Sequence, residues 1–460
     1  MTANVSHSDK DRMAEIDRCL GMIGPSSSDE SKFVGMLVLP RLLQQDNVEQ
    51  IQHVFDEMNF KFIERLLRTP KNENAEIPES VLREIAVNIL ACFARYETMA
   101  TSQPMVDKIP GLSIILTPND SSDLTQEILH ILLCVAVNKE GLVKMLDPDV
   151  LKNILEVFVE TEKEEERKLC VDLIKAIYGR TCHRLHEAKV PSLMSSLRYS
   201  LKTLFGILAS VFNQDQAKLK FYCLDILANV LPDLPDEVVQ AHKKEVEPEA
   251  TWLVNIRRGL RQIVTNKVGD ELRDQATLVT ACLVRYYGPQ WLFSPLLRTK
   301  QARRLKDQDG DKKAAEEYYA EANFPALLIH IVSVEARVMV DQINDIRQAA
   351  HNQTTPRQVE ADKRHKVVLP LLFEILEGAI EYLSESFDEN EESQMDPDML
   401  LKLRTTLSDT MDVVMELLQF IQNTTLPEES EDDPVAQACM RIVALWLAEE
   451  GYEMPEGGDN

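Results

Sequence analysis

Side chains of the kind that bind zinc gather between positions 170 and 186 of the sequence. Cys170, Cys182, His183 and His186 could each supply a metal ligand. Zinc sites usually show two regularly spaced pairs of ligands, whereas the spacing here is irregular. The pattern favours a polar cluster near the end of a helix, so we assign no metal site.

A stretch around Gly310 resembles a calcium-binding loop. With Gly310 at loop position six, Asp307 and Asp309 fall at positions that usually hold ligands. The first ligand position falls on Leu305, which has no carboxylate, and this loss should cripple the coordination of calcium. We therefore interpret the stretch as a charged loop.

The familiar motifs of catalysis are missing from the sequence. It contains no G-x-x-x-x-G-K-[ST] phosphate loop, no G-x-S-x-G turn, no H-E-x-x-H zinc motif and no set of kinase motifs. We predict no catalytic residue, no cofactor and no enzyme activity. An enzyme whose site is assembled from distant residues is a remaining alternative, because one sequence does not show spatial neighbours.

Five arginines are candidates for binding a partner. Arg257, Arg258 and Arg261 lie on one face of an expected helix, and Arg303 and Arg304 stand in a basic run. Guanidinium groups pair well with carboxylates and phosphates, so these side chains could recognise an acidic group of a partner. The alternative is that they are ordinary surface arginines.

Apolar residues recur at helical spacing along almost the whole chain. In Leu124–Val135 they stand at i, i+4, i+7, i+8 and i+11, and several other runs show similar spacing. Long alternating patterns typical of strands do not occur. We predict an all-α protein in which Leu132, Ile154 and Trp446 are buried between helices.

Several helix starts can be recognised. Asp147, Asp396 and Asp433 each precede a proline and an apolar run. An aspartate side chain accepts hydrogen bonds from free amides at a helix start, and a proline in the first position has no donor to lose. Asp123 with Gln126 resembles a capping box. We predict that these four aspartates are N-caps.

Many amphipathic helices joined by short linkers predict a stacked helical solenoid, because one helix pair cannot bury its apolar face alone. No strict repeat is visible, but the loose spacing is that of armadillo or HEAT units, about 40–47 residues. We predict an armadillo/HEAT-like solenoid, or superhelix. An irregular all-α globule is the alternative.

We divide the chain into parts by composition and pattern. They are residues 1–32, a short polar segment with one weak helix; 33–297, a helical repeat array; 298–322, a charged insertion; 323–450, a continuing array with acidic loops at 385–398 and 427–434; and 451–460, an acidic tail.

The negative charge is concentrated near the C-terminus. The whole chain carries −26, and residues 376–460 hold 22 acids and three bases, which gives −19 and leaves −7 for the rest. This charge excludes a protein that binds nucleic acid by broad phosphate neutralisation. Solvated loops and helix faces are one interpretation. The other is a surface that attracts basic partners.

The sequence predicts a cytoplasmic protein. The first ten residues are polar, no apolar signal region follows them, and we find no run of roughly 20 largely apolar residues that would span a membrane. The eight cysteines are scattered, mostly in apolar helical patterns, as is typical of small core residues in a reducing compartment. Peripheral association with a membrane is left open.

Five blocks of sequence resemble the neurochondrin family. They are Phe60-Lys61-Phe62 with Arg65-Leu66-Leu67, Leu90-Ala91-Cys92-Phe93, Lys108-Ile109-Pro110, Val334-Glu335-Ala336-Arg337-Val338 and Leu445-Trp446-Leu447-Ala448-Glu449-Glu450. Each block is weak alone. Their order and spacing over roughly residues 60–450 make the match specific.

The resemblance implies a cytoplasmic, neuron-enriched regulator without catalytic activity, found in neuronal projections and dendrites. Members are associated with neurite outgrowth and synaptic plasticity, and are described as negative regulators of calcium/calmodulin-dependent protein kinase II phosphorylation. The partners that the resemblance implies are a kinase, receptor cytoplasmic tails or an endosomal GTPase. Its implied fold, an armadillo-like helical array, agrees with the periodicity.

The chain departs from the family at both ends. The mammalian member attaches to membranes through acylated cysteines near its N-terminus, whereas residues 1–18 contain none and Cys19 is a single thiol. Stable anchoring normally takes two signals, so we assign no lipidation site. Members also continue well beyond the Trp446 block, so we expect a truncated chain or a shortened form.

Periodicity and resemblance together favour a non-catalytic regulatory scaffold whose surface masks a phosphorylation segment. A solenoid adaptor in vesicle trafficking or nuclear transport is the alternative, and it rests on analogy of fold alone.

Overall fold

The computed structural model describes residues 7–43, 47–70, 77–119, 123–247, 249–306, 312–348, 356–388, 395–424 and 433–449. Within these ranges the regular structure is helical and no strand occurs. The prediction of an all-α, armadillo-like solenoid is confirmed. The chain divides into two compact units: unit 1 is Met1–Leu208 with Asp233–Val238, and unit 2 is Ala209–Pro232 with Val239–Asn460.

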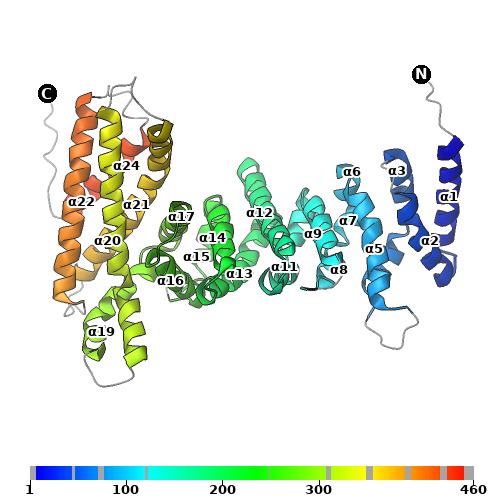
Figure 1. Ribbon diagram of the computed structural model, residues 1–460, viewed down its shortest axis with the longest axis horizontal. Helices are drawn as coiled ribbons and strands as arrows, with labels where there is room; N and C mark the ends of the chain where they lie inside the picture. Colours follow the sequence, from blue (N-terminus) through cyan, green and yellow to red (C-terminus); the bar gives the residue numbers. More distant parts are fainter. Residues whose placement is uncertain are drawn as a thin grey trace. The chain divides into compact units, whose positions relative to one another are not determined.

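Unit 1 is built mainly from short helices that follow one another in chain order (Figure 1). They are α1 (His7–Ile23), α2 (Asp29–Leu42), α3 (Val48–Glu57), α4 (Phe60–Leu67), α5 (Glu79–Ala94), α6 (Glu97–Ala100), α7 (Gln103–Val106), α8 (Ile109–Ile114), α9 (Leu124–Val135), α10 (Lys139–Met145), α11 (Pro148–Glu160) and α12 (Glu164–Glu187). Two more helices, α13 (Pro191–Gln214) and α15 (Asp236–Lys243), begin in unit 1 and end in unit 2.

Hydrogen bonds in unit 1 join side chains to groups about one repeat away in sequence. Lys108 Nζ donates to Glu64 Oε2 at 2.8 Å across 44 residues. Arg180 Nη1 donates to the carbonyls of Leu133 and Ala136 near the end of α9, across 47 and 44 residues. Separations of this size match the length of an armadillo or HEAT unit. The structure therefore contains a repeat that the sequence shows only loosely.

The apolar stripes form the core of unit 1. The stripe of Leu124–Val135 is buried on α9, and Leu132 and Ile154 are fully inaccessible to solvent. Their predicted burial is confirmed. Trp446, on a helix of unit 2, is only partly buried, and the prediction that it is buried between helices is wrong. It stands beside a cavity, which is described below.

Three of the four predicted N-caps are confirmed. Asp147 accepts a hydrogen bond from the amide of Asp149 at 3.0 Å, and Asp433 does the same for Val435 at 3.0 Å. Asp396 accepts from the amide of Asp398 at 3.3 Å. The capping box at Asp123 is wrong, because its backbone is not extended (ψ 12°) and its side chain makes no cap hydrogen bond.

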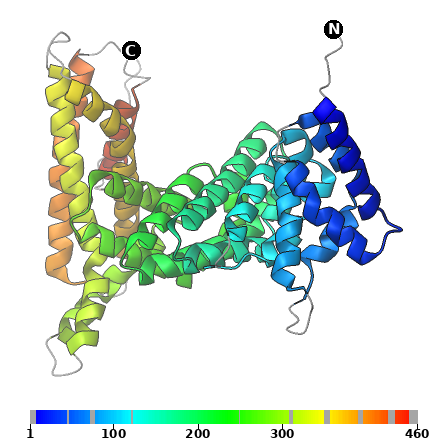
Figure 2. The same ribbon diagram turned by 45° about the vertical axis from the view of Figure 1, so that its right-hand side comes forward.

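Along the chain of unit 2, shorter helices are followed by long ones. Its helices are α14 (Lys218–Val230), α16 (Thr251–Val264), α17 (Asp270–Tyr287), α18 (Gln290–Phe293), the 3-10 helix η1 (Ser294–Arg298), α19 (Thr299–Lys306), α20 (Lys312–Gln348), α21 (Pro356–Asp388), α22 (Pro397–Thr424) and α24 (Pro434–Glu449). Helices α20, α21, α22 and α24 run side by side as a bundle (Figures 1 and 2).

Two glycines permit local geometry in unit 2. Gly288 ends α17 with a positive φ of 83°, a conformation that other residues adopt only with strain. Gly259 lets α16 approach α13 closely, because a Cβ atom there would stand 2.2 Å from Cδ1 of Phe212. Any side chain at 259 would therefore push the two helices apart.

Helix α20 is the one described helix long and apolar enough, by length and composition, to cross a membrane. Its most apolar window has a mean hydropathy of 1.4, and 56% of that window is buried inside the protein. A helix that packs against neighbours in a bundle has this character, because part of its surface is buried. The absence of a transmembrane segment stays a prediction.

The predicted insertions contain more helix than expected. Residues 298–322 hold α19 and the start of α20, and Ala302 is fully buried. The predicted acidic loop at 385–398 is helical at both ends, because α21 continues to Asp388 and α22 begins at Pro397. Residues 307–311, 427–432 and 451–460, which include the calcium-loop positions and the acidic tail, lie outside the described residues.

Candidate partner-binding site

Arg257, in the arginine cluster of α16, faces inward rather than toward a partner. Arg257 is 2% exposed, and its guanidinium donates to the Trp291 carbonyl at 2.5 Å and to Glu321 Oε1 at 3.2 Å. The partner-binding prediction is therefore wrong for Arg257. Its carboxylate partner is 64 residues away in sequence, so no local pattern could have revealed the pair.

Arg258 and Arg261 join the same helix to α20. Arg258 Nη2 donates to Glu321 Oε2 at 3.0 Å, and Arg261 pairs with Glu317. Burial raises the pKa of Glu321, but hydrogen bonds from Arg258 and Arg257 outweigh it and lower that pKa below its ordinary value. These arginines tie α16 to α20, and partner binding by Arg258 and Arg261 stays a prediction.

Arg303 brings the two predicted insertions together. Its Nη1 donates to Asp396 Oδ2 at 2.6 Å and to Asp398 Oδ2 at 3.4 Å, and these hydrogen bonds raise the pKa of Arg303. The Asp396 amide donates to Thr299 Oγ1 at 3.1 Å. Arg303 of the basic run and the two aspartates at the start of α22 are thus partners of each other. Arg304 is exposed on α19.

A hollow of about 520 Å³ lies beside Arg303, between α19, α20 and α22. Its lining mixes charged and apolar side chains, among them His330, Lys402 and Leu327. Leu327 is 41% exposed, so the hollow opens to solvent over an apolar patch. We name it the Arg303 hollow. It could receive a polar segment of a protein, but its charges are already largely paired within the chain.

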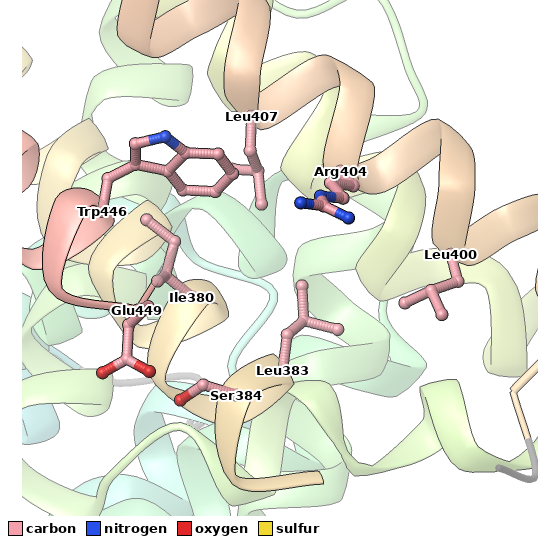
Figure 3. Close-up of a pocket in the computed structure, with 8 residues that line it drawn as sticks. All are labelled: Ile380, Leu383, Ser384, Leu400, Arg404, Leu407, Trp446 and Glu449. Carbon is pink, nitrogen blue, oxygen red and sulfur yellow. The ribbon is translucent and has the colours of Figure 1, made fainter. Parts of the chain in front are cut away.

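A second cavity, of about 410 Å³, lies between α21, α22 and α24 (Figure 3). We name it the Trp446 pocket. Its apolar lining consists of Ile380, Leu383, Leu400, Leu407 and Trp446. Ile380 and Leu383 lie three positions apart on α21, and Leu400 and Leu407 lie seven apart, or two turns, on α22, so each helix contributes two of these side chains from one face. Sequence analysis missed the pocket, although Trp446 belongs to a block that carried the family resemblance.

Three polar residues complete the Trp446 pocket. Arg404 lies on the α22 side, while Ser384 of α21 and Glu449 of α24 lie together on the other side (Figure 3). The described lining contains no histidine that could serve Ser384 as a base. The arrangement is suited to holding an apolar side chain with a charged neighbour.

The zinc-type residues of α12 do not converge. Cys170 and Cys182 are buried in the core, and burial raises the pKa of Cys182 to about 12. His183 points to solvent with 75% of its side chain exposed, and His186 Nε2 donates to the Asp233 carbonyl at 3.0 Å. Among the described residues, no group of three or more histidines, cysteines and acids could hold a metal ion.

One buried lysine has an unusual environment. Lys220 of α14 is 4% exposed, and its ammonium group donates to the Phe212 carbonyl and to Gln262 Oε1. Burial lowers the pKa of Lys220 to about 8. Both partners are acceptors within unit 2, and none of the cavities described above is lined by Lys220, so we regard it as a structural link.

Comparison with solved structures gives distant similarity. A computationally designed armadillo repeat protein for modular peptide recognition aligns with 59% of this chain and 98% of its own, at 16% identity and a TM-score of 0.36. The TSC2 N-terminus aligns with 95% of this chain and 99% of its own, at 11% identity and a TM-score of 0.43. Scores this low add nothing to what the helices themselves show.

Comparison of sequences gives a consistent family. A neurochondrin homolog from Drosophila melanogaster is 21% identical over 95% of this chain, and neurochondrin from Homo sapiens is 22% identical over 95%. The aligned parts are 54% and 51% of those proteins, so the chain spans about half the length of the curated relatives it matches. The family model of neurochondrin matches residues 10–457. This chain therefore belongs to the neurochondrin family.

Proposed function

We propose that this protein is a non-catalytic regulatory scaffold that binds protein segments and thereby lowers phosphorylation by calcium/calmodulin-dependent protein kinase II. The observation that carries the proposal is the match of the neurochondrin model to residues 10–457. A cytoplasmic location and a part in neurite outgrowth and synaptic signalling belong to the same proposal. Receptor cytoplasmic tails and an endosomal GTPase are further proposed partners.

The surface of the protein supports binding rather than chemistry as the mechanism. Open hollows lie between long helices, and the charged residues Arg303, Asp396 and Asp398 of the Arg303 hollow are paired within the chain. A rigid surface of this kind can mask a phosphorylation segment by occupying it, without any reaction. The extent of inhibition should then depend on how many molecules of this protein are bound and should not increase with the time of incubation.

The test uses purified kinase activated by calcium and calmodulin. We expect its autophosphorylation to fall as this protein is added and to level off near a stoichiometric ratio. Raising the ATP concentration should not relieve the inhibition, because a masked segment does not compete with nucleotide. Unchanged phosphorylation at a large excess of this protein would exclude the proposed role.

A further inference from the structure

The walls of the Trp446 pocket are held in place by ion pairs. Arg441 Nε of α24 donates to Glu377 Oε1 of α21 at 2.7 Å. At the start of α24, Arg347 Nη2 of α20 donates to Asp433 Oδ2 at 2.6 Å. Two contacts along one helix fix the position of α24 against the bundle. A ligand that enters the pocket therefore meets a cavity that is already formed, which lowers the cost of binding.

The lining of the pocket is suited to an apolar side chain. Trp446 lies across one wall above Ile380, with Leu383 and Leu407 nearby (Figure 3). Protein interfaces derive most of their binding energy from a few aromatic and arginine residues at well-packed pockets. A volume of about 410 Å³ falls in the range of natural ligand sites. It has room for a large aliphatic or aromatic side chain.

The charge around the pocket determines whether a basic or an acidic ligand is attracted. Glu449 is exposed at the edge of the pocket beside Ser384 (Figure 3). Arg404 is the one base among the described residues that line the pocket. The described residues of 376–460, which include all eight lining residues, contain 11 acids and three bases. A basic segment is attracted to such a surface, and an acidic segment is repelled.

We propose that the Trp446 pocket binds a basic amphipathic helix of a partner protein, with one apolar side chain seated against Trp446 and a neighbouring lysine or arginine beside Glu449. An amphipathic helix in an apolar groove is a recurring mode of peptide recognition. The proposal rests on the scaffold function above and names the chemistry of its partner. The partner contributes the cation and the apolar anchor, and this protein contributes the cavity and the acids.

The test observes Trp446 directly in the intact chain. The protein contains three tryptophans, so labelling with 5-fluorotryptophan should give three fluorine resonances, and Trp446→Phe identifies the one of interest. The probe is a synthetic leucine–lysine amphipathic peptide of about 14 residues, which forms about four helical turns. We expect a saturable shift of the Trp446 resonance, with the signals of Trp252 and Trp291 unchanged.

Two further peptides separate the apolar contact from the charge. Replacing every leucine by alanine removes the anchor, and replacing every lysine by glutamate reverses the charge. Each change should weaken the effect on Trp446 by about tenfold or more, because anchors and complementary charge both contribute at such sites. Binding of the leucine–lysine peptide should also weaken as salt is raised, since exposed charges are screened.

Two pairs of variants test the site itself. Leu400 lines the pocket, whereas its neighbour Leu401 is 67% exposed, so Leu400→Asp should weaken peptide binding about tenfold and Leu401→Asp should not. Glu449→Lys should weaken it, while Glu416→Lys, which changes the net charge equally at an exposed position of α22, should not. Glu449 is exposed, so that variant remains informative even if Leu400→Asp unfolds.

The proposal is overturned if the glutamate peptide binds as well as the lysine peptide, or if Glu449→Lys behaves like Glu416→Lys. It is also overturned if the Trp446 resonance responds only to protein concentration, as in self-association, or only to lipid vesicles. Its failure is distinct from failure of the scaffold function. If the peptide binds but the kinase is not inhibited, the pocket stands as a binding site and the kinase role is excluded. If the Trp446→Phe, Leu400→Asp and Glu449→Lys variants still inhibit the kinase, the kinase role stands and the pocket is excluded as the site that carries it.

Discussion

Unit 1 and the bundle of long helices in unit 2 are each held together by links that span different distances along the chain. In unit 1, side-chain links between helices span 36 residues from His53 to Asp17 and 48 residues from Lys189 to Glu237. In unit 2, the long helices are joined across 86 residues from Arg347 to Asp433 and 90 residues from Arg364 to Asp274. Each repeat of unit 1 is held by contacts with the adjacent repeat, whereas the bundle of unit 2 is held by contacts between helices that are far apart in the sequence.

The difference has consequences for stability. In a repeat array each unit contacts only its neighbours, so part of the array can open while the rest stays folded. Contacts across longer separations require larger loops to close before they contribute. We therefore expect unit 1 to lose structure gradually and the bundle of unit 2 to lose it in a more concerted way. Four predictions test this contrast.

The largest effect is expected from Leu132→Asp in unit 1. Leu132 is fully buried on α9, and an unpaired carboxylate in that apolar seam should cost roughly 3–5 kcal/mol of unfolding free energy. Ile114→Asp is the control, because Ile114 is 69% exposed and its loss should change stability by about 0.5 kcal/mol or less. Chemical denaturation measures both.

Amide hydrogen exchange then shows where the Leu132 variant opens. We expect faster exchange in α9 and its neighbours α5 and α12, with α20 and α22 still protected. Equal loss of protection in both units would contradict the proposed contrast. It would mean that the repeats of unit 1 do not open independently of the bundle.

The second largest effect is expected from Glu321→Ala in unit 2. This change leaves the buried Arg257 without its carboxylate, and breaking a buried pair typically costs about 3 kcal/mol or more. Glu317→Ala is the matched control, because Glu317 is 60% exposed and its pair with Arg261 should contribute about 1 kcal/mol or less. Equal destabilisation by the two variants would show that burial of Arg257 is not what matters.

Local sequence patterns were sufficient for the helices and most of their starts. The buried face of α9 and the caps at Asp147, Asp396 and Asp433 depend on residues within a few positions of each other. Asp123 failed because a cap also depends on backbone conformation, which the residue types do not fix. These features lie within single helices, where spacing and geometry are directly linked.

The candidate sites depend on contacts that span the chain, which sequence spacing does not reveal. Arg257 is buried against Glu321, 64 residues away, and Arg303 meets Asp396, 93 residues away. In the sequence, an arginine that pairs within the chain looks the same as an arginine that binds a partner. The Trp446 pocket likewise forms where three helices meet, and its leucines are spaced like any core stripe.

A third, smaller effect is expected when the pH is lowered. His365 on α21 of unit 2 is 1% exposed, and burial, with a further contribution from Arg364, lowers its pKa below the ordinary 6.5. Asp362 acts in the opposite direction. Because the unfolded chain binds this proton more readily, stability should be fully present above pH 6.5 and should fall as the pH drops below that value.

The pH effect of His365 has an upper limit and a control. One proton can contribute at most about 1.4 kcal/mol per pH unit. His365→Gln should flatten the fall in unfolding free energy between neutral pH and the acid range of the carboxylates. His183→Gln, the same change at an exposed position of α12 in unit 1, is the control. If the unfolding free energy of the His365 variant falls with pH as steeply as that of the unaltered protein, this histidine does not contribute to the contrast between the two units.

The smallest effect is expected for the exposed ion pair between Lys189 and Glu237 in unit 1. It spans 48 residues, but 78% of the lysine side chain and 53% of the glutamate side chain are exposed. A double-mutant cycle with Lys189→Gln and Glu237→Gln should give a coupling free energy of about 0.5 kcal/mol or less, and added salt should reduce it. A coupling as large as the cost of Glu321→Ala would contradict our account, because exposed pairs would then hold the repeats together as strongly as the buried pair holds the bundle. A small coupling leaves buried apolar seams such as that of Leu132 as the main source of order in unit 1.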